Sequence, residues 1–446
     1  MIELWKPNES VLKVIGEGAY SPKKKYRRAY QTVAKETEEG VLFFQTLTKA
    51  FCLLDRAEFR EMTEGKLDPI GELGNYLLRN RFLVPEETDE IATVESVREI
   101  FRIFGRKGEG IRNFEILPTT DCNARCFYCY EAGCKKMTMT KETALRVCDY
   151  VDKSRDGEKL INLAWFGGEP LYNSAAIDVI TAELTRRKIK FRSDMVSNGY
   201  LFDRAMIKKA VKKWNLKLIQ ITLDGTKEVY NRRKAYIYRD KNAFDRVLKN
   251  IEGLLKAGVE VKIRLNMDGK NSADLWELSD ILEKRFGKYE NCSVYPRLLY
   301  QVPDDDVLAY REFERFRESL KERKLSTETK LQKNIRYWQC MADNPESVVI
   351  LPDGSLTSCE HFNETREPWG NIADDRVDEE TRNSYRQYYD YSEECVTCPY
   401  LPNCLRNREC PEHKEKCSEK RKQKHIYDIG IGMLNEYNCL KKEGKV

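Results

Sequence analysis

The sequence lacks any run of apolar residues long enough to cross a bilayer as a helix. The first twenty residues carry Glu3, Lys6 and Glu9, so they also lack the apolar centre of a secretory signal peptide. We therefore expect a cytoplasmic protein without a membrane-spanning segment.

The chain also lacks a strong excess of charge of either sign. Its 78 lysine and arginine residues stand against 73 acidic residues, which leaves a net charge of +5. Proteins that bind a phosphate backbone usually carry a strongly basic domain, so the composition gives no reason to expect nucleic acid as a partner. The basic runs at 23–28 and 420–424 are interpreted as solvated faces, with a docking surface for an acidic peptide as the second interpretation.

What the chain does contain is material for packed cores and many cysteines. Hydrophobic residues make up 41% of its 446 residues, and this length predicts two or three domains. Fifteen cysteines in a cytosolic protein are not expected to form a disulfide framework, because that compartment is reducing. Most of them lie in tight groups, which favours metal ligands.

A repeat of strand and helix begins at Phe114. Its pattern predicts strands at 114–119, 163–166, 190–196, 218–223, 259–266 and 293–299, with helices at 141–153, 175–187, 204–213, 244–256 and 275–285. Such a repeat predicts an α/β fold with a parallel sheet, either doubly wound or curved into a barrel. Catalytic residues are then expected at the carboxyl ends of the strands.

The segments before and after this repeat have different patterns. A β-hairpin is predicted at 30–47, with helices at 48–54 and 71–80, which together outline a winged-helix-like module. After a charged helix at 306–323, the chain is rich in cysteine and turn residues and poor in regular pattern, so bound metal is expected to hold it together. The predicted domains are 1–109, 110–325 and 326–446.

A first group of cysteines follows the first strand of the repeat. Cys122, Cys126 and Cys129 share one short loop, and three such thiolates can hold three irons of a 4Fe–4S cluster while the fourth iron stays open for chemistry. From the spacing alone, the alternative is a zinc site completed by Cys134 or Cys148.

The C-x3-C-x-aromatic-C loop and the strand ends behind it resemble the radical S-adenosylmethionine (radical SAM) superfamily, from Phe114 to about Leu299. The resemblance implies a partial (β/α)6 TIM-like barrel, a 4Fe–4S cluster on the three cysteines, and S-adenosylmethionine on its open iron. Arg264 is the candidate to grip the methionine carboxylate, because a guanidinium forms forked hydrogen bonds. The other implied cofactor contacts are Tyr128, Gly167, Gly168, Glu169, Pro170, Ser197, Asn198 and Asp224.

A second group of cysteines resembles the SPASM extension of this superfamily. The resemblance implies two auxiliary 4Fe–4S clusters, an outer one on Cys395, Cys398, Cys404 and Cys417 and an inner one on Cys340, Cys359 and Cys410. The chain departs from the family pattern between Cys404 and Cys410, where five residues stand in place of three. No cysteine follows Cys340 at short range, so we expect the inner cluster to keep an open iron for a substrate thiolate. The alternatives that would close it are Cys292, Cys417 and Cys439.

The resemblance implies an enzyme that edits a peptide by hydrogen abstraction. A winged-helix-like module at the N-terminus is typical of maturases that bind the leader of a ribosomally made precursor (a RiPP precursor) by strand addition. We predict a thioether-forming maturase that takes electrons from a donor of the flavodoxin or ferredoxin type. Carbon–carbon crosslinking, epimerisation, an anaerobic sulfatase maturase and a non-enzymatic metal scaffold are the alternatives. Glu360, beside Cys359, is the candidate catalytic base, with Asp224 as a weaker candidate.

Overall fold

The structure is a computed structural model in which contacts divide the chain into two units. The small unit comprises Met1–Lys107, Glu328–Cys340 and Gln387–Val446, and the barrel unit comprises Gly108–Thr327 and Met341–Arg386. The division predicted from the sequence, into 1–109, 110–325 and 326–446, stays a prediction. The residues that the structure describes are 1–104, 110–238, 240–303, 306–326, 330–335, 338, 340–360, 368–374, 376–388, 390–404, 417 and 419–446.

The barrel unit is built on a curved, mostly parallel sheet. Six parallel strands lie side by side in chain order, namely β7 (Asn113–Thr119), β8 (Leu160–Gly167), β9 (Lys190–Ser197), β10 (Leu216–Leu223), β11 (Glu260–Met267) and β12 (Cys292–Leu298). Beyond β7 the sheet continues with β13 (Ser347–Ile350) in parallel, and then with β14 (Ser355–Thr357) and β15 (Gly370–Asn371) in antiparallel pairing. This arrangement confirms the predicted α/β partial barrel.

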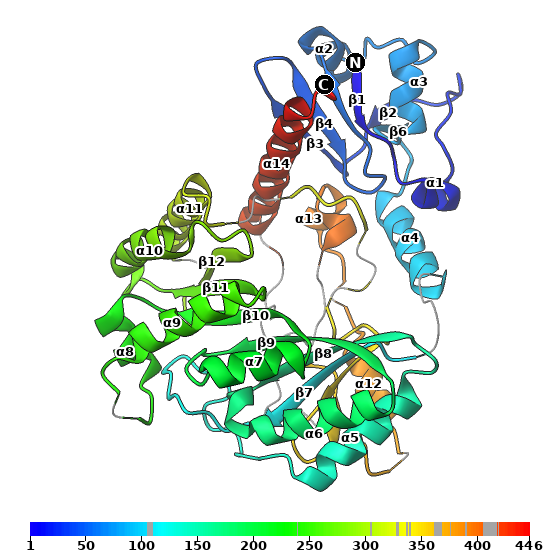
Figure 1. Cartoon of the computed structure of the whole chain (residues 1–446). Coiled ribbons are helices and arrows are strands. Elements are labelled where there is room, and N and C mark those ends of the chain that lie inside the picture. The colour runs from blue at the N-terminus through cyan, green and yellow to red at the C-terminus, as the bar shows by residue number, and fades with distance from the viewer. Residues whose placement is uncertain are drawn as a thin grey trace. The chain divides into compact units, whose positions relative to one another are not determined.

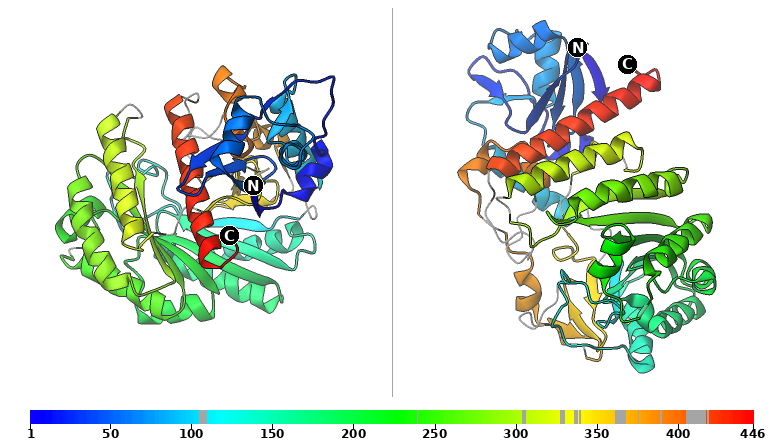
Figure 2. Two further views of the ribbon diagram at one scale, coloured as in Figure 1. Left: turned by 90° about the horizontal axis from the view of Figure 1, so that it is seen from above. Right: turned by 90° about the vertical axis from the view of Figure 1, so that its left-hand side faces the viewer.

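Helices cover the outer side of this sheet (Figures 1 and 2). They are α5 (Lys141–Ser154), the 3-10 turn η1 (Pro170–Asn173), α6 (Ser174–Arg186), α7 (Arg204–Lys212), α8 (Lys227–Lys234), α9 (Ala243–Lys256), α10 (Ser272–Phe286) and α11 (Val307–Glu322); α12 (Glu379–Ser384) follows β15. Several of the helices begin at side-chain caps; for example, Thr140 accepts from the N–H of Thr143, and Asp203 accepts from that of Met206.

The main core lies between the strands and these helices. Phe114 and Ile116 of β7 belong to it, as do Ile263 and Leu265 of β11. Because side chains alternate across a strand, the residues between them face the inside of the barrel. The polar side chains of that inner face include Glu115, Gln220, Arg264, Asn266, Tyr295 and Arg297.

The small unit contains a four-stranded antiparallel sheet. Its strands lie in the order β1 (Ile2–Trp5), β5 (Phe51–Leu54), β4 (Val41–Gln45) and β3 (Thr32–Glu36). One face packs against α2 (Arg56–Thr63) and α3 (Glu72–Arg79), and the other packs against α14 (Glu419–Lys442). The remaining elements are α1 (Glu9–Ile15), β2 (Tyr26–Arg28) paired with β6 (Leu83–Pro85), α4 (Glu90–Phe104), α13 (Glu393–Val396) and the 3-10 turn η2 (Leu401–Asn403).

Two predictions for this unit were wrong. Residues 48–54, predicted as a helix, form a turn and β5, because pairing with β1 and β4 buries every side chain of that strand. The C-terminal segment, predicted to be poor in regular structure, contains the long helix α14, which buries Met433 and Tyr437 against the sheet. Across the part of the chain that the structure describes, no helix combines the length and apolar character that a membrane crossing needs.

Candidate active site

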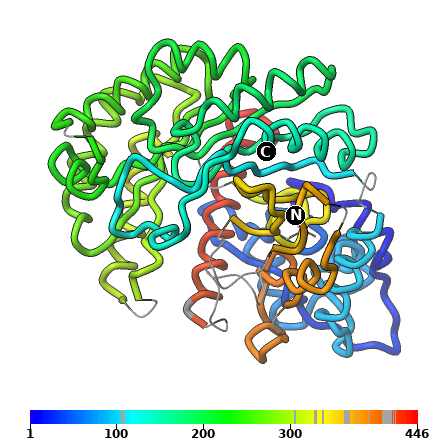
Figure 3. Tube along the Cα trace, turned by 90° about the horizontal axis from the view of Figure 1, so that it is seen from below, coloured from blue at the N-terminus to red at the C-terminus, as the bar shows by residue number. Residues whose placement is uncertain are grey.

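A long loop follows β7 at the carboxyl end of the sheet (cyan in Figure 3). Threonines close its base: the Met137 N–H donates to Thr120 Oγ1 at 2.8 Å, and Thr119 Oγ1 donates to the Met137 carbonyl at 2.7 Å. The loop therefore leaves and returns at one point, and it carries Cys122, Cys126 and Cys129 between these anchors.

The three thiols of this loop lie near one another and are partly buried. Burial, and then the neighbouring charges of Glu169 and Cys126, raise the pKa of Cys122 to about 12. Burial also raises the pKa of Cys129, and Cys126 adds to that rise. Thiolates in this position need positive charge beside them, which is what an iron–sulfur cluster supplies.

Two buried polar atoms beside the loop also indicate a bound group at this site. Asp224 Oδ1 and Asn123 Nδ2 are buried and have no hydrogen-bond partner among the described residues. The donor set and these atoms fit a 4Fe–4S cluster with S-adenosylmethionine beside it. Across the described ranges, no group of three or more His, Cys, Asp or Glu side chains is arranged to hold a single metal ion. Cys148, the alternative zinc ligand, lies in the core and donates to the Ala144 carbonyl at 3.3 Å.

The Gly167–Gly168 pair brings the end of β8 against the start of the cysteine loop. The Gly168 N–H donates to the Thr119 carbonyl at 3.2 Å, and the Glu169 N–H donates to the Asp121 carbonyl at 3.0 Å. A Cβ on Gly167 would lie 2.3 Å from the Thr119 carbonyl oxygen, and one on Gly168 would lie 2.4 Å from that of Asp121. Only glycine permits this approach.

Glu169 is fully buried and contacts two of the other predicted residues, Ser197 and Asn198. Its carboxylate accepts from the Ser197 hydroxyl at 2.9 Å, from the Asn198 N–H at 2.8 Å and from the Leu171 N–H at 3.2 Å. Burial raises its pKa to about 7 against the opposing effect of these hydrogen bonds. Asn198 in turn donates to Asn123 Oδ1 at 2.6 Å, which connects the end of β9 to the cysteine loop.

A buried cluster of three polar groups lies on the other side of the loop. Tyr128 donates to Asp224 Oδ2 at 2.5 Å, and Lys234 Nζ lies 2.9 Å from the Tyr128 hydroxyl and 3.2 Å from Asp224 Oδ2. Burial lowers the pKa of Lys234, but the charges of Asp224, Tyr128 and Cys126 outweigh it, so the pKa lies well above its ordinary value.

Lys234 also holds the loop through its backbone, and sequence reasoning missed it. Its carbonyl accepts from the Arg125 N–H at 2.9 Å and lies 3.9 Å from the Cys126 thiol. No signal was available, because the helix α8 that ends at Lys234 has no clear apolar face.

Arg264 lies on the inner face of β11, near the end of that strand. Its Nε donates to Asn266 Oδ1 at 2.9 Å, so this predicted residue is held by a neighbour on the same strand. On the neighbouring strands Tyr295 donates to Gln220 Oε1 at 2.5 Å, which continues the polar lining across the sheet.

Glu360 lines a pocket beside the cysteine loop. The pocket has about 270 Å³ of empty space, part of it open to solvent, and is lined by Leu117, Thr120, Glu131, Cys134, Lys135, Met137 and Glu360. Burial raises the pKa of Glu131 to about 7. Burial and then the charge of Glu360 raise the pKa of Glu115 well above its ordinary value. Glu360 is therefore one of three neighbouring carboxyl groups, two of which sequence reasoning missed.

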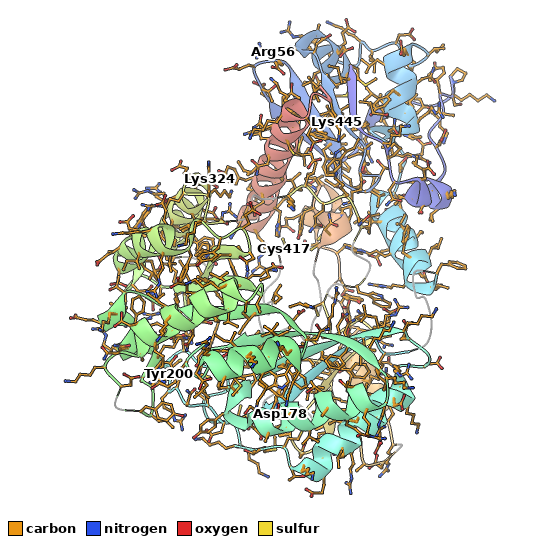
Figure 4. All side chains as sticks on the ribbon, viewed as in Figure 1. Arg56, Asp178, Tyr200, Lys324, Cys417 and Lys445 are labelled. Carbon is orange, nitrogen blue, oxygen red and sulfur yellow. The ribbon has the colours of Figure 1, made fainter. Side chains whose placement is uncertain are left out.

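The second cysteine group is divided between the two units. In the small unit, the thiols of Cys395, Cys398 and Cys417 lie close enough to interact electrostatically, and burial followed by such neighbours raises the pKa values of Cys398 and Cys417. Figure 4 labels Cys417 just before α14. Cys340 belongs to the small unit and Cys359 to the barrel unit. Cys410 lies outside the described residues, so the structure does not place it.

Arg98 of α4 fixes the chain beside these thiols, and sequence reasoning missed this residue as well. Its guanidinium is buried and donates to the Leu401 carbonyl at 2.6 Å and to the Cys404 carbonyl at 3.4 Å. Lys422 of α14 donates to Thr397 Oγ1 at 2.8 Å, so this lysine of the basic run is not simply solvated.

The family model for the radical SAM superfamily matches residues 116–282. Curated relatives include a probable GTP 3′,8-cyclase of Thermococcus kodakarensis, 26% identical over 190 residues, and one of Aeropyrum pernix, 29% identical over 186 residues. The matched segments are 41% and 40% of this chain, and the chain spans about half the length of these relatives, 56% and 49%.

Solved structures match more of the chain. Streptococcus suis SuiB bound to the precursor peptide SuiA is 14% identical, with a TM-score of 0.52, and the match covers 88% of this chain and 97% of that one. The enzyme anSMEcpe with bound AdoMet is 19% identical, with a TM-score of 0.55, and covers 74% of this chain and 99% of its own. These likenesses describe the fold.

Proposed function

With residues 116–282 forming a radical SAM domain, we propose that this radical SAM enzyme modifies a ribosomally made precursor peptide by joining a cysteine sulfur to a carbon atom in a thioether. The observation that carries the proposal is the share of this chain that each comparison covers. The match to SuiB with its precursor peptide extends over 88% of this chain, whereas the matches to GTP 3′,8-cyclases extend over 40% to 64% of it.

The residues at the cysteine loop have separable roles in this proposal. Cys122, Cys126 and Cys129 hold the 4Fe–4S cluster, and Gly167 and Gly168 let the backbone approach the methionine end of S-adenosylmethionine. When bound, the cluster and S-adenosylmethionine supply a 5′-deoxyadenosyl radical that abstracts hydrogen from the substrate.

Residues at the other strand ends position this machinery. Arg264 binds the methionine carboxylate, and Tyr128 places its backbone against the adenine. Glu169 acts as a positioning residue, because its carboxylate is occupied by Ser197, Asn198 and Leu171 and is closed to solvent. Pro170 begins the 3-10 turn that keeps Glu169 in place.

We assign the leader-binding role to residues 1–109 and specifically to β3. This strand pairs with β4 on one side and has no strand partner on the other side among the described residues. Helix α14 packs on the face of the sheet, which leaves the β3 backbone as an edge. An extended leader can add a strand to such an edge through backbone hydrogen bonds.

The proposal of thioether formation rests on the assignment of residues 326–446 as a SPASM extension. Cys395, Cys398, Cys404 and Cys417 hold an outer auxiliary cluster, and Cys340, Cys359 and Cys410 hold an inner one with an open iron for the substrate thiolate. Glu360 is then placed beside the inner cluster as the base that takes the thiol proton. We place this chemistry in the cytoplasm, where reducing conditions keep the cysteines available.

Two other substrates remain as candidates. The curated relatives are GTP 3′,8-cyclases, which makes GTP the second candidate substrate. The anSMEcpe complex with the Cp18Cys peptide makes a sulfatase-type peptide the third. The anSMEcpe match covers 74% of this chain, less than the 88% that the SuiB match covers.

The test starts from anaerobic protein reconstituted with iron and sulfide. About twelve irons per chain and dithionite-driven formation of 5′-deoxyadenosine support three clusters, whereas about four support only the first. The protein is then incubated with GTP, with a sulfatase peptide and with cysteine-containing precursor peptides encoded beside its gene. Loss of two hydrogen atoms from a precursor, with its thiol no longer alkylated, is the expected result. Conversion of GTP alone would overturn the proposal.

A further inference from the structure

The segment after α8 covers the first cysteine loop. The Ile237 N–H donates to the Asn123 carbonyl at 2.9 Å, and the Arg125 N–H donates to the Lys234 carbonyl, also at 2.9 Å. Ala235, between them, has the left-handed φ of 44° that turns the chain back from the helix. A backbone hydrogen bond therefore joins residues 235–238 directly to the loop that carries the first cysteines, and the outer surface of this segment lies over that loop.

That outer surface is apolar and exposed. Ile237 is 45% exposed, Tyr238 is 37% exposed and Tyr172, from the turn after β8, is 42% exposed. After burial, the nearby groups of Tyr172 and Cys122 raise the pKa of Tyr238, so Tyr238 lies near both. Single exposed apolar side chains are ordinary, but three together above a redox loop form a patch that marks an interaction site.

Packed tyrosine rings run inward from this patch. The ring of Tyr238 stacks on that of Tyr200 at 5.2 Å, and Tyr200 contacts Tyr236 at 4.6 Å. The Tyr236 hydroxyl lies 2.8 Å from that of the buried Tyr230, whose ring centre is 6.0 Å from Lys234 Nζ. Figure 4 labels Tyr200, which lies beside the loop between α8 and α9. The rings give a continuous packed path from the surface to the cysteine loop.

The surroundings of the patch are basic. Residues 227–249 contain eight lysine and arginine residues against three acidic ones, and two of the eight, Arg233 and Lys234, are buried in ion pairs. Arg246 lies over the Tyr200 ring and pairs with Asp240 at 3.3 Å. Arg232 and Lys241 are exposed and form no ion pair with any described residue. Such unpaired basic side chains around an apolar centre steer an acidic protein partner.

We propose that this surface, formed by Tyr172, Ile237 and Tyr238 with Arg232 and Lys241 at its rim, docks an acidic protein that carries one electron at low potential. The inference rests on the proposed function, since it assumes that the cysteine loop holds a cluster that needs an electron. One electron passes from the reduced carrier to the loop-bound cluster, and the carrier leaves oxidised. The contact is small and sensitive to salt, as electron-transfer complexes are.

Two reductants separate docking from the chemistry of the site. Formation of 5′-deoxyadenosine is measured with dithionite, a small molecule, and with flavodoxin, its reductase and NADPH. Ile237→Glu and the double variant Arg232→Glu/Lys241→Glu are compared with Lys190→Glu, which reverses an exposed charge at the start of β9. We expect the flavodoxin-driven rate to fall about tenfold or more in the first two variants and to be unchanged in the third. The dithionite-driven rate should be unchanged in all three.

Flavodoxin binding, followed by fluorescence anisotropy on the reconstituted enzyme, provides a readout independent of turnover. Affinity should fall in the same two variants and weaken with added salt. Unchanged affinity and flavodoxin-driven rate in both variants would overturn the proposal, and so would an equal loss with both reductants. If the wild type forms no 5′-deoxyadenosine with dithionite, the proposed function fails, and the anisotropy comparison alone decides the docking surface. Weaker binding of an acidic precursor peptide with normal flavodoxin binding would assign the surface to the substrate instead.

Discussion

Lys234 Nζ lies 3.2 Å from Asp224 Oδ2, and both side chains are buried, with 4% and 0% of their surface exposed. The pair joins the end of α8 to the end of β10, directly beside the cysteine loop. Removing one member of a buried ion pair leaves the other charge without compensation, which costs more than the pair itself contributes.

Lys234→Met should therefore lower the free energy of unfolding by about 3 kcal/mol, because Asp224 is left buried without its ion-pair partner. The measurement is urea denaturation. The double variant Lys234→Met/Asp224→Asn should recover much of the loss, since both charges are then absent. A double variant as unstable as the sum of the single variants would show that the two residues do not interact.

Glu169 makes the unfolding free energy depend on pH. Its pKa in the folded chain is raised to about 7 from an ordinary value of 4.5, so the folded state holds the proton more tightly than the unfolded state. Between these two values the folded state binds more protons, and stability is highest below pH 4.5 and falls as the pH rises to about 7. Above pH 7 this contribution is constant.

Glu169→Gln should remove that dependence, because the amide does not ionise. The difference in unfolding free energy between wild type and Glu169→Gln should change by about 3 kcal/mol between pH 4.5 and pH 7. Glu260→Gln, at an exposed position at the start of β11, is the matched control and should show no such trend. A pH-independent difference for Glu169→Gln would mean that its carboxyl ionises as it does in water.

The strands of the barrel could be predicted from the sequence because each has apolar side chains at every second position, as Val261, Ile263 and Leu265 show. Residues 51–54 could not be predicted in this way, since they are buried on both faces and leave no alternation. Helix α14 was missed because its charged first turns hide the few residues that pack on the sheet.

The residues of the candidate site also divide into those that the sequence predicts and those that it does not. Cys122, Gly167 and Ser197 could be predicted as candidate site residues because they belong to motifs at strand ends. Lys234 and Arg98 act through contacts between segments that are distant in sequence, such as the 303 residues between Arg98 and Leu401. Only the folded chain reveals partners of that kind.

Gly167→Ala should disturb the cysteine loop. The φ of Gly167 is 108°, and an added Cβ would lie 2.3 Å from the Thr119 carbonyl oxygen, so the variant combines backbone strain with a steric clash. Gly133→Ala is a matched control, because its φ is 90° and an added Cβ meets nothing within 4 Å. Gly133→Ala should cost about 1 kcal/mol, and Gly167→Ala should cost more and also weaken S-adenosylmethionine binding by calorimetry. Equal costs with normal binding would contradict the close approach of β8 to the loop.

Strand addition at β3 can be tested with two neighbouring prolines. In an antiparallel pair the N–H groups of successive residues point alternately toward the partner strand and away from it. Ala34 and Lys35 are neighbours on β3, opposite Phe43 and Leu42 of β4, so one of their N–H groups points to β4 and the other to the open edge. Proline at the first kind of position removes a bond of the sheet and lowers the melting temperature, whereas proline at the second removes a donor available to a leader peptide.

We therefore expect one of the variants Ala34→Pro and Lys35→Pro to keep the wild-type melting temperature and to lose leader-peptide affinity, measured by fluorescence anisotropy with a labelled precursor. The same variant should keep dithionite-driven 5′-deoxyadenosine formation, because the cysteine loop belongs to the other unit. A stable variant that binds the leader as tightly as wild type would place recognition at the β1 edge or outside the sheet. Leader binding is then to be sought with the corresponding proline at Glu3 of β1, whose partner in the sheet is Cys52 of β5.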